Sequence, residues 1–544
     1  MPTQPFRGNL AEHLFKNAKN NPSAIAVISH QNIPCHWTFE DLHQDVIKCA
    51  SFFLSKGIKK GDRTLLMVNP GYDLIVYCFA LLYIGSIPII IDPGMGLFSL
   101  LKCVRRSKPK VLLTVPLIGF ISWFFRKTFS TVKIKLSLAK NFISQIENVP
   151  LGENLKSEEA DDSDLAAIVF TSGSTGPPKG VRYLHRNFNA QIQVLKDIFG
   201  IIEGEIDLVT LPVFSLFNPA LGVTSVIPRM NPRKPAKAKA SNILDAINKY
   251  KTTSAFCSPV IGSKIMDFCK KHNVKLTNMN RIMLAGAPSS PYLISSLSSH
   301  LPNGKVIVPY GATEALPVSY SDHVTIKQLA KSTLEGEGSN LGKPVQGVSI
   351  LLFPIRNSPL PDDSDEKIKP IKEKFITGEI CVSGDTVTDG YDNMPGATRD
   401  ARFTFNGKEY HRMGDLGHWD KDKNLRFMGR KAECVLTKSG PLETERCEPI
   451  FNEIKGVRRC ALIGIGHDNI KEPSLVVEID KEMNIKKEEI KEKILYLLKN
   501  DYSRFGITRV FFEKKLPVDA RHNAKIHRLS LSKKWTSIVS AYNK

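Results

Sequence analysis

The sequence predicts an α/β protein built from mixed, mostly parallel sheets with helices on both faces. Short apolar runs alternate with amphipathic helical patterns from residue 10 to residue 101, and the alternation resumes from 206 to 350. Such alternation is typical of parallel strands joined by crossover helices. At 544 residues the chain is long enough for more than one domain. Its content of 42% hydrophobic and 24% charged residues is ordinary for a globular protein.

The first elements follow one another closely along the chain. Residues 24–28 predict a strand, and Thr38 then opens a helix as its N-terminal cap, with Asp41 completing a weak capping box. This helix runs to Gly57, a residue type that commonly ends helices. Residues 63–68 predict the next strand. The start of the chain is therefore expected to form part of the α/β region.

A loop of small polar residues follows a predicted buried strand at 165–170. Such a loop directs several backbone N–H groups and hydroxyls into one concavity, which suits a polyphosphate. Lys179 adds a positive charge, and because Gly180 follows it the loop is not a Walker motif. A helical pattern through Leu195 comes next. The candidate phosphate-binding residues are Thr171, Ser172, Gly173, Ser174, Thr175, Gly176 and Lys179.

A second candidate site lies at 308–314, where a predicted strand ends in a glycine followed by a hydroxyl and a carboxylate. Thr313 can hold a phosphate oxygen, and the adjacent Glu314 can hold Mg²⁺. Tyr310 offers an aromatic ring on which an adenine can stack. The stretch therefore indicates a nucleotide site rather than a plain turn.

These two stretches, with four others, resemble motifs of the adenylate-forming superfamily, which contains acyl-CoA synthetases, luciferases and peptide-synthetase adenylation domains. Residues 310–314 resemble its Tyr-Gly-x-Thr-Glu motif, and 285–288 are similar to a Gly-Gly-Ala-Pro turn beside the adenine pocket. Residues 410–415 resemble Tyr-x-Thr-Gly-Asp, with Met413 in place of Thr. The resemblance implies further ATP-binding residues, namely Gly286, Ala287, Pro288, Tyr310, Gly311, Ala312, Asp415 and Arg430.

The resemblance also implies the catalytic residues and the cofactors, which are ATP and Mg²⁺. Thr313 is expected to meet the α-phosphate, and Glu314 to bind the metal ion together with Thr175. Lys525 matches the lysine that reaches the α-phosphate and the carboxylate during adenylation. Carboxylate attack on ATP brings two anions together, so a mobile ammonium and Mg²⁺ both offset their repulsion.

A two-domain organisation follows from the same resemblance. Arg430 is expected to bind ribose, and the next residue, Lys431, to be the hinge of a mobile domain. The expected domains are a large N-terminal adenylation domain at 1–430 and a small mobile α+β domain at 431–544, which carries the catalytic lysine.

Residues 211–222 point to a particular branch of the superfamily. Thiol-accepting members usually have Pro-x-Phe-His here, but this chain has Ser215 in place of the histidine. Phe214, Phe217 and Gly222 are candidate substrate-binding residues of an apolar acyl channel, with ordinary core packing as the alternative. The sequence of this segment resembles that of the β-lactone synthetases of bacterial long-chain olefin biosynthesis. That family implies ATP-dependent closure of a long-chain β-hydroxy fatty acid to a β-lactone, with release of AMP and pyrophosphate. The first alternative is a fatty-acid–CoA ligase, and the second is a basic membrane- or nucleic-acid-binding protein that is not an enzyme.

The charge of the chain bears on its partners. An excess of 75 Lys and Arg over 54 Asp and Glu gives a net charge of +21, which suits an anionic surface, an anionic substrate or a solvated lysine-rich exterior. Nucleic-acid binding is not expected, because the chain lacks the alternation of aromatic and basic residues that marks recognition modules. The cysteine and histidine spacing does not indicate a structural metal.

One apolar stretch raises the question of membrane contact. Residues 112–125 are rich in apolar and aromatic residues, are too short to cross a bilayer, and are flanked by basic clusters. They predict either a packed strand and helix or a membrane-interface patch. The N-terminus has no apolar signal core, and the ten cysteines read as buried thiols of a reducing compartment. We therefore expect a cytoplasmic protein, with peripheral contact at the inner membrane or assembly with other lipid-pathway enzymes as open alternatives.

Overall fold

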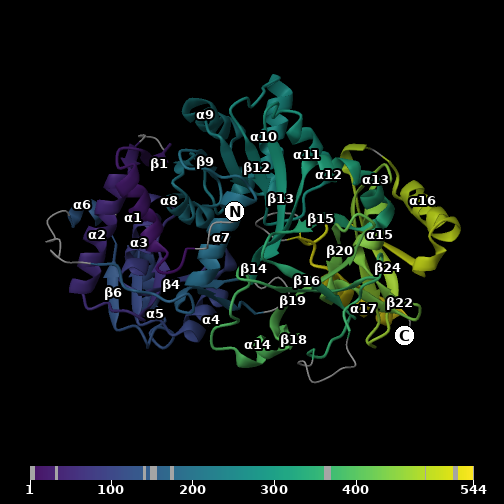
Figure 1. Ribbon diagram of the computed structural model, residues 1–544. Coiled ribbons are helices and arrows are strands. Elements are labelled where there is room, and N and C mark those ends of the chain that lie inside the picture. The colour runs from purple at the N-terminus through teal and green to yellow at the C-terminus, as the bar shows by residue number, and fades with distance from the viewer. Residues whose placement is uncertain are drawn as a thin grey trace.

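The computed structural model describes residues 6–30, 35–138, 142–146, 156–171, 177–360, 369–483, 485–518 and 525–542. In these residues two large sheets with flanking helices account for most of the chain, and a smaller unit formed by the C-terminal segment lies at one end (Figure 1). The predicted α/β class with mixed sheets and flanking helices is confirmed, but antiparallel pairings outnumber parallel ones in the larger sheet, so that sheet is not mostly parallel.

The larger sheet has fourteen strands in the described part of the chain. The strands from β1 through β10, β9, β11 and β12 to β13 run parallel, and those beyond β13 pair antiparallel as far as β16. Its strands are β1 (Ile25–Ser29), β2 (Cys35–Thr38), β9 (Ile206–Val209), β10 (Thr224–Ile227), β11 (Ser254–Cys257), β12 (Arg281–Leu284), β13 (Lys305–Ala312), β14 (Ala315–Asp322), β15 (Ser339–Pro344), β16 (Ser349–Phe353), β17 (Gly378–Ser383), β18 (Arg402–Phe405), β19 (Lys408–Trp419) and β20 (Leu425–Arg430).

The second sheet has six strands among the described residues, parallel except for the edge strand β8. Its order is β6 (Ile134–Ser137), β5 (Val111–Thr114), β3 (Arg63–Met67), β4 (Ile87–Ile90), β7 (Leu165–Phe170) and β8 (Gly180–Leu184). The ion pair of Arg63 with buried Asp392 (2.7 Å) ties this sheet to the segment before β18.

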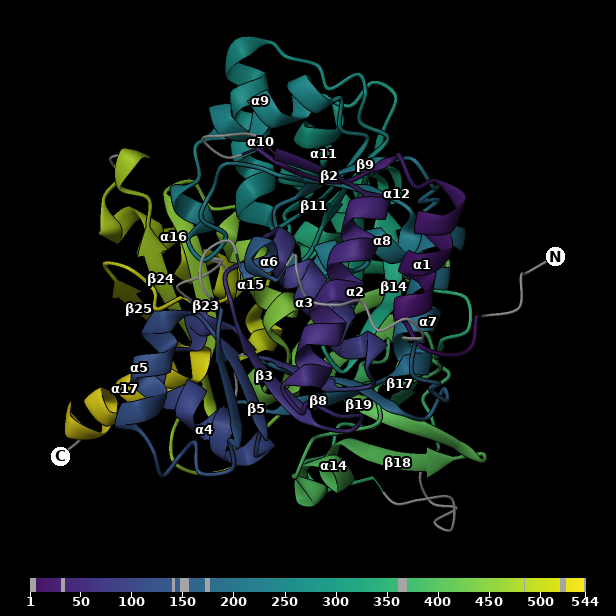
Figure 2. The same cartoon turned by 90° about the vertical axis from the view of Figure 1, so that its left-hand side faces the viewer.

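Helices bury the apolar faces of both sheets. One core lies under α1, α2, α3 and α7, and another under α9, α10 and α11. Two further helices, α4 and α5, lie on the outer side of the six-stranded sheet (Figure 2). Their bounds are α1 (Ala11–Asn20), α2 (Phe39–Ser55), α3 (Tyr72–Tyr83), α4 (Leu97–Ser107), α5 (Pro116–Phe124), α7 (His185–Asp197), α9 (Ala240–Tyr250), α10 (Pro259–His272) and α11 (Pro291–Ser298). No helix of the described residues is long and apolar enough to cross a bilayer.

Local sequence signals correctly predicted several of these elements. Thr38 caps α2, and its capping box with Asp41 is formed in both directions, with Asp41 N 3.0 Å from the Thr38 hydroxyl. The strand predicted at 165–170 has those bounds, and the strand at 63–68 ends one residue earlier. The sequence interpretation missed β8, which leaves the phosphate loop and pairs antiparallel with β7 before α7 begins.

The segment after Arg430 forms its own small sheets and cores. A three-stranded sheet packs against α15 and α16 on one face and α17 on the other. Its elements are β21 (Val435–Thr437), β22 (Gly440–Leu442), α15 (Thr444–Asn452), β23 (Val457–Ile465), β24 (Glu472–Ile479), α16 (Lys487–Asn500), β25 (Arg509–Glu513) and α17 (Arg528–Tyr542). The 430/431 domain boundary and the mobility of this segment stay predictions.

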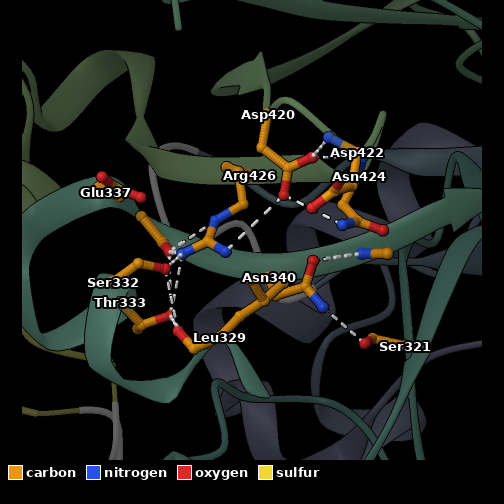
Figure 3. A network of polar contacts seen from close by, with 12 residues as sticks. Ser321, Leu329, Ser332, Thr333, Glu337, Asn340, Asp420, Asp422, Asn424 and Arg426 are labelled. Atoms are coloured by element: carbon orange, nitrogen blue, oxygen red, sulfur yellow. Dashed lines mark hydrogen bonds and ion pairs between the residues drawn. The ribbon is translucent and has the colours of Figure 1, made fainter. Parts of the chain in front are cut away.

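A buried arginine supports the strand that leads to this boundary (Figure 3). Arg426 in β20 is 1% exposed, and its guanidinium donates to the Gly338 carbonyl (2.7 Å) and to the hydroxyls of Ser332 and Thr333. Asp420 lies 4.0 Å from the same guanidinium and accepts from two backbone N–H groups of the β19–β20 turn. The network holds β20, and with it Arg430, against the 332–338 turn.

Candidate active site

The centre of the site is the tip of the β13–β14 hairpin. Ala312 pairs with Ala315, so Thr313 and Glu314 are the two residues of the turn. Gly311 is required before the turn, because a Cβ there would lie 2.5 Å from the Ala315 carbonyl oxygen. The turn presents a hydroxyl and a carboxylate side by side, as the sequence predicted.

Other segments hold this turn in place. The Tyr183 hydroxyl donates to the Thr313 carbonyl (2.6 Å), and the Thr388 backbone N–H donates to the Glu314 carbonyl (2.9 Å). The Tyr391 hydroxyl donates to the Glu314 carboxylate at Oε1 (2.8 Å). The Thr313–Glu314 turn is therefore positioned by β8 and by the 388–391 segment together.

Tyr391 also connects the turn to the phosphate loop. Lys179 Nζ lies 4.4 Å from the centroid of the Tyr391 ring, a distance that favours a cation–π contact. The positive charge of Lys179 and the carboxylate of Glu314 therefore both contact one tyrosine, the first at its ring and the second at its hydroxyl. Sequence reasoning missed Tyr391, which follows Gly390 in an irregular segment that carries no local motif.

Only the base of the phosphate loop can be described. The Thr171 backbone N–H donates to the Lys179 carbonyl (3.0 Å), which closes the loop between β7 and β8. Ser172, Gly173, Ser174, Thr175 and Gly176 lie outside the described residues, and so does the Thr175 half of the expected metal site. Among the described residues no group of three or more His, Cys, Asp or Glu could hold a metal ion. Glu314 alone suits Mg²⁺, which commonly takes one carboxylate and completes its shell with substrate phosphates and water.

The predicted ribose-binding residues come together on β19 and β20. Asp415 is 3% exposed, accepts a hydrogen bond from the Tyr310 hydroxyl (2.7 Å) at Oδ2, and lies 2.9 Å from Arg430 Nη1 at Oδ1. The Oδ1 contact is an ion pair without hydrogen-bond geometry, so Oδ1 has no hydrogen-bond donor within the described structure. A buried oxygen in this state fits a ligand hydroxyl.

Charges around Asp415 show how the site is assembled. Burial raises the pKa of Asp415, and Arg430, the Tyr310 hydrogen bond and Lys525 each oppose that rise. Lys525, 110 positions further along the chain, is therefore close enough to act electrostatically on this carboxylate. Asp415 in turn raises the pKa of Arg430, which keeps the guanidinium charged.

The residues predicted to border the adenine follow a neighbouring strand of the same sheet. Gly286, Ala287 and Pro288 come after β12, which pairs in parallel with the first residues of β13, the strand that carries Tyr310. Gly286 has φ +90°, which a glycine adopts without strain. Gly286 and Pro288 are exposed and Ala287 is half-buried, so the turn is accessible beside Tyr310.

An apolar cavity of about 50 Å³ adjoins the hairpin. Phe214 and Phe217 line it, as predicted, whereas Gly222 does not. Gly222 instead has φ +72°, between two lining residues, and a Cβ there would lie 2.7 Å from Glu203 Cγ. The remaining lining residues are Gln191, Leu195, Phe199, Ile201, Asp207, Asn218, Leu221, Val223, Ser254, Phe256, Met283, Pro309, Leu316 and Pro317.

Two further predicted positions have defined contacts. Ser215, which stands where thiol-accepting relatives carry histidine, is buried, and its hydroxyl donates to the Pro212 carbonyl (2.6 Å). Lys431, the expected hinge, places Nζ 2.8 Å from Glu379 Oε1 and 3.2 Å from the Arg356 carbonyl. Glu379 is itself buried and paired with Arg412, so Lys431 is anchored to the larger sheet.

This fold and site belong to a known class. The chain belongs to the AMP-binding enzyme family, whose family model matches residues 14–392, and it is an adenylate-forming ligase. It is 34% identical to the olefin beta-lactone synthetase of Stenotrophomonas maltophilia, over 97% of this chain and 98% of that protein.

Solved structures share the fold at lower identity. ATP-bound MatB from Rhodopseudomonas palustris aligns with a TM-score of 0.79 at 19% identity, covering 97% of this chain and 99% of that chain. O-succinylbenzoate coenzyme A synthetase (MenE) from Bacillus subtilis, in complex with ATP and magnesium ion, aligns with a TM-score of 0.75 at 20% identity, covering 96% and 99%.

Proposed function

We propose that the enzyme activates a long-chain β-hydroxy fatty acid as its acyl-adenylate and closes the adenylate to a β-lactone. The observation that carries the proposal is the apolar cavity, which reaches the hairpin bearing Thr313 and Glu314 through Leu316 and Pro317. The name of the S. maltophilia relative supports the same product. An acyl chain in this cavity would present its carboxylate at the turn.

The reaction is balanced without a thiol. In the first step the carboxylate oxygen attacks the α-phosphorus of ATP, a P–O bond breaks, and pyrophosphate leaves with the electron pair. In the second step the β-hydroxyl oxygen attacks the acyl carbon, the bond from that carbon to the AMP oxygen breaks, and the hydroxyl proton ends on AMP. Ser215, buried and bonded to Pro212, fits an enzyme that needs no external acceptor.

ATP is a substrate of this reaction, and its expected contacts agree with the described geometry. We assign the ribose hydroxyls to Asp415 and Arg430, since Asp415 Oδ1 is buried and lacks a hydrogen-bond donor within the described structure. Thr313 would hold the α-phosphate, and Lys525 would offset the charge that gathers there during attack. Glu314 would hold Mg²⁺, which when bound neutralises phosphate charge.

The product separates this proposal from its alternative. The purified protein is incubated with ATP, Mg²⁺ and a long-chain 3-hydroxy acid, with and without coenzyme A, and the products are identified by mass spectrometry. A β-lactone formed without coenzyme A supports the proposal. A thioester formed only with coenzyme A identifies a fatty-acid–CoA ligase and overturns the closure step.

We propose further that the protein is cytoplasmic and touches an anionic membrane surface. An exposed aromatic face, defined here as Phe98 of α4 with Phe120, Trp123 and Phe124 of α5, has all four side chains more than half exposed. Between Asp92 and Glu147 the chain carries ten Lys or Arg residues and no acidic residue. Arg126 lies 5.1 Å over the Trp123 ring, so cationic and aromatic groups share this surface. Exposed aromatics beside basic residues suit the interface of anionic lipids.

Vesicle binding tests this contact. Co-sedimentation with vesicles containing phosphatidylglycerol should capture the protein, and binding should fall in high salt or with neutral vesicles. The double variant Trp123→Ala, Phe124→Ala should lose binding, whereas Tyr292→Ala, which removes an exposed aromatic elsewhere, should keep it. Failure of the wild-type protein to bind anionic vesicles would overturn the membrane contact. The aromatic face would then be expected to bind another protein of the same lipid pathway.

A further inference from the structure

One polar side chain in the acyl cavity has an unused hydrogen-bonding atom. Gln191 of α7 is 3% exposed and lines the cavity. Its amide nitrogen donates to the Leu316 carbonyl (2.8 Å). A carbonyl oxygen can only accept, so the nitrogen must face Leu316 and the amide oxygen must point the other way. The orientation of the amide is therefore set by its partner.

The amide oxygen of Gln191 is buried and has no hydrogen-bond partner within the described part of the chain. The neighbouring Tyr183 hydroxyl has a single hydrogen, which it donates to the Thr313 carbonyl (2.6 Å). Buried acceptors are almost always satisfied in folded proteins, and an exception calls for a ligand or a solvent molecule. This oxygen is therefore a vacant acceptor on a residue that lines the cavity.

The other polar groups of the cavity are engaged with one another. The buried carboxylate of Asp207 accepts from the Ser254 hydroxyl at 2.8 Å and from the Asn218 amide at 3.2 Å. Most of the remaining lining is apolar, including Phe214 and Phe217. Among the described residues that line the cavity, the Gln191 oxygen is therefore a side-chain acceptor to which a substrate hydroxyl could donate without breaking an existing hydrogen bond.

The position of Gln191 along the cavity indicates which substrate atom it meets. Its partner Leu316 is two residues from Glu314, and its neighbour Tyr183 holds the Thr313 carbonyl. Gln191 therefore lies at the end of the cavity that adjoins the turn where the carboxylate is activated. In a 3-hydroxy acid the hydroxyl is two carbons from that carboxylate.

We propose that the amide oxygen of Gln191 accepts a hydrogen bond from the C3 hydroxyl of the acid, which makes Gln191 a specificity-determining residue. The inference rests on the proposed function, because it concerns the substrate of that same site. An unsubstituted acid leaves the oxygen unpaired, and a 3-oxo acid places a second acceptor against it. Both are disfavoured relative to the 3-hydroxy acid.

Kinetics of pyrophosphate release test the inference. The wild-type enzyme is given acids of equal length that carry hydroxyl, hydrogen or fluorine at C3, and kcat/KM is measured for each. We expect the 3-hydroxy acid to be favoured by about tenfold over the other two, since fluorine cannot donate a hydrogen bond. In Gln191→Met this preference should shrink to about twofold or less, with adenylation of the unsubstituted acid retained.

Gln193→Met is the matched control. Gln193 lies on the same helix, donates to Asp197 (2.6 Å) and does not line the cavity, so its variant should keep the full preference. If Gln191→Met is active and discriminates as well as the wild type, the inference is wrong while the proposed function stands.

The substrate series alone also decides the inference if Gln191→Met does not fold. Equal use of the 3-fluoro and 3-hydroxy acids by the wild-type enzyme would overturn it. Wild-type enzyme that releases no pyrophosphate with any of the acids would overturn the proposed function, and the inference with it.

Discussion

Asp415 and Arg430 face each other across β19 and β20, with Asp415 Oδ1 2.9 Å from Arg430 Nη1. The carboxylate is buried, whereas the arginine side chain is 37% exposed. A buried carboxylate beside an accessible cation is a preorganised acceptor for neutral hydroxyls. The proposed ribose contacts would therefore come from two paired strands rather than from a loop.

Asp415→Asn should weaken ATP binding by roughly tenfold to a hundredfold, because the substitution keeps the side-chain size but removes the charge from the acceptor. The KM for ATP in pyrophosphate release, supported by calorimetric titration, measures the effect. Asp422→Asn changes an exposed carboxylate of the same hairpin and should leave the KM unaltered. An unchanged KM in Asp415→Asn would remove Asp415 from the nucleotide site.

Lys525→Ala should lower the rate of adenylation by roughly a hundredfold or more, since the ammonium acts on charge that develops during attack. The free energy of unfolding should change by less than about 0.5 kcal/mol, because a half-buried lysine adds little to folding. Single-turnover pyrophosphate release and urea unfolding measure the two effects. Lys533→Ala, on the exposed face of α17, is the matched control and should behave as wild type. Undiminished release by Lys525→Ala would contradict its assigned role.

Tyr391→Phe should lower kcat by about tenfold, because it removes the donor to Glu314 and keeps the ring beneath Lys179. Tyr391→Leu removes both contacts and should lower kcat further. Steady-state kinetics at saturating ATP measure the series. If both variants retain full activity, the contacts of Tyr391 with Glu314 and Lys179 do not contribute to catalysis.

Arg426→Met should lower the free energy of unfolding by about 3 kcal/mol, because it leaves the buried Gly338 carbonyl without its donor and the buried Asp420 carboxylate without its ion-pair partner. Urea denaturation of the two proteins measures the loss. Lys421→Met, an exposed position in the adjacent turn, is the control and should unfold as the wild type does. A free energy of unfolding equal to that of the wild type would show that the network in Figure 3 makes no net contribution to stability.

Acid should destabilise the fold through buried histidines. Burial lowers the pKa of His185 and of His411 to about 4, from an ordinary value of 6.5. Below pH 6.5 the unfolded chain binds protons that the native state does not, so stability present above pH 6.5 is lost as the pH falls toward 4. Each histidine should lower the free energy of unfolding by about 2 kcal/mol at pH 5 relative to pH 7.5.

His185→Gln isolates one of these contributions. The Nδ1 atom of His185 accepts from the Leu10 backbone N–H (3.2 Å), which requires the unprotonated ring. Urea unfolding at pH 7.5 and at pH 5 should show a stability difference smaller by about 2 kcal/mol in the variant. An identical pH dependence in both proteins would mean that His185 titrates normally when folded.

The sequence was informative where the signal was local. The strand before the phosphate loop, the cap of α2 and the turn at Thr313–Glu314 each depend on neighbouring residues, and the structure has them as expected. The short strand β8 was missed because its five residues follow a proline- and glycine-rich loop and run directly into α7.

The rest of the site depends on contacts that join distant segments. Tyr391 meets Glu314 from 77 positions away, and Gln191 meets Leu316 from 125 positions away. Neither tyrosine nor glutamine sits in a recognisable motif, so only the packing of the segments identifies these residues. Residues 112–125 had two open interpretations: the strand β5 is packed, as one of them expected, whereas the exposed Trp123 of α5 fits the proposed membrane interface.

The β13–β14 hairpin joins the two proposed pockets, since Tyr310, which contacts Asp415, lies on one arm and Leu316 lines the apolar cavity from the other. Attempts to engineer the enzyme for bulkier or shorter acids would therefore face a trade-off at Leu316 and Pro317, because a shift there also moves the hairpin that carries Tyr310. Substitutions at Val223 or Phe214, which line the cavity from outside this hairpin, offer a safer route to new substrates.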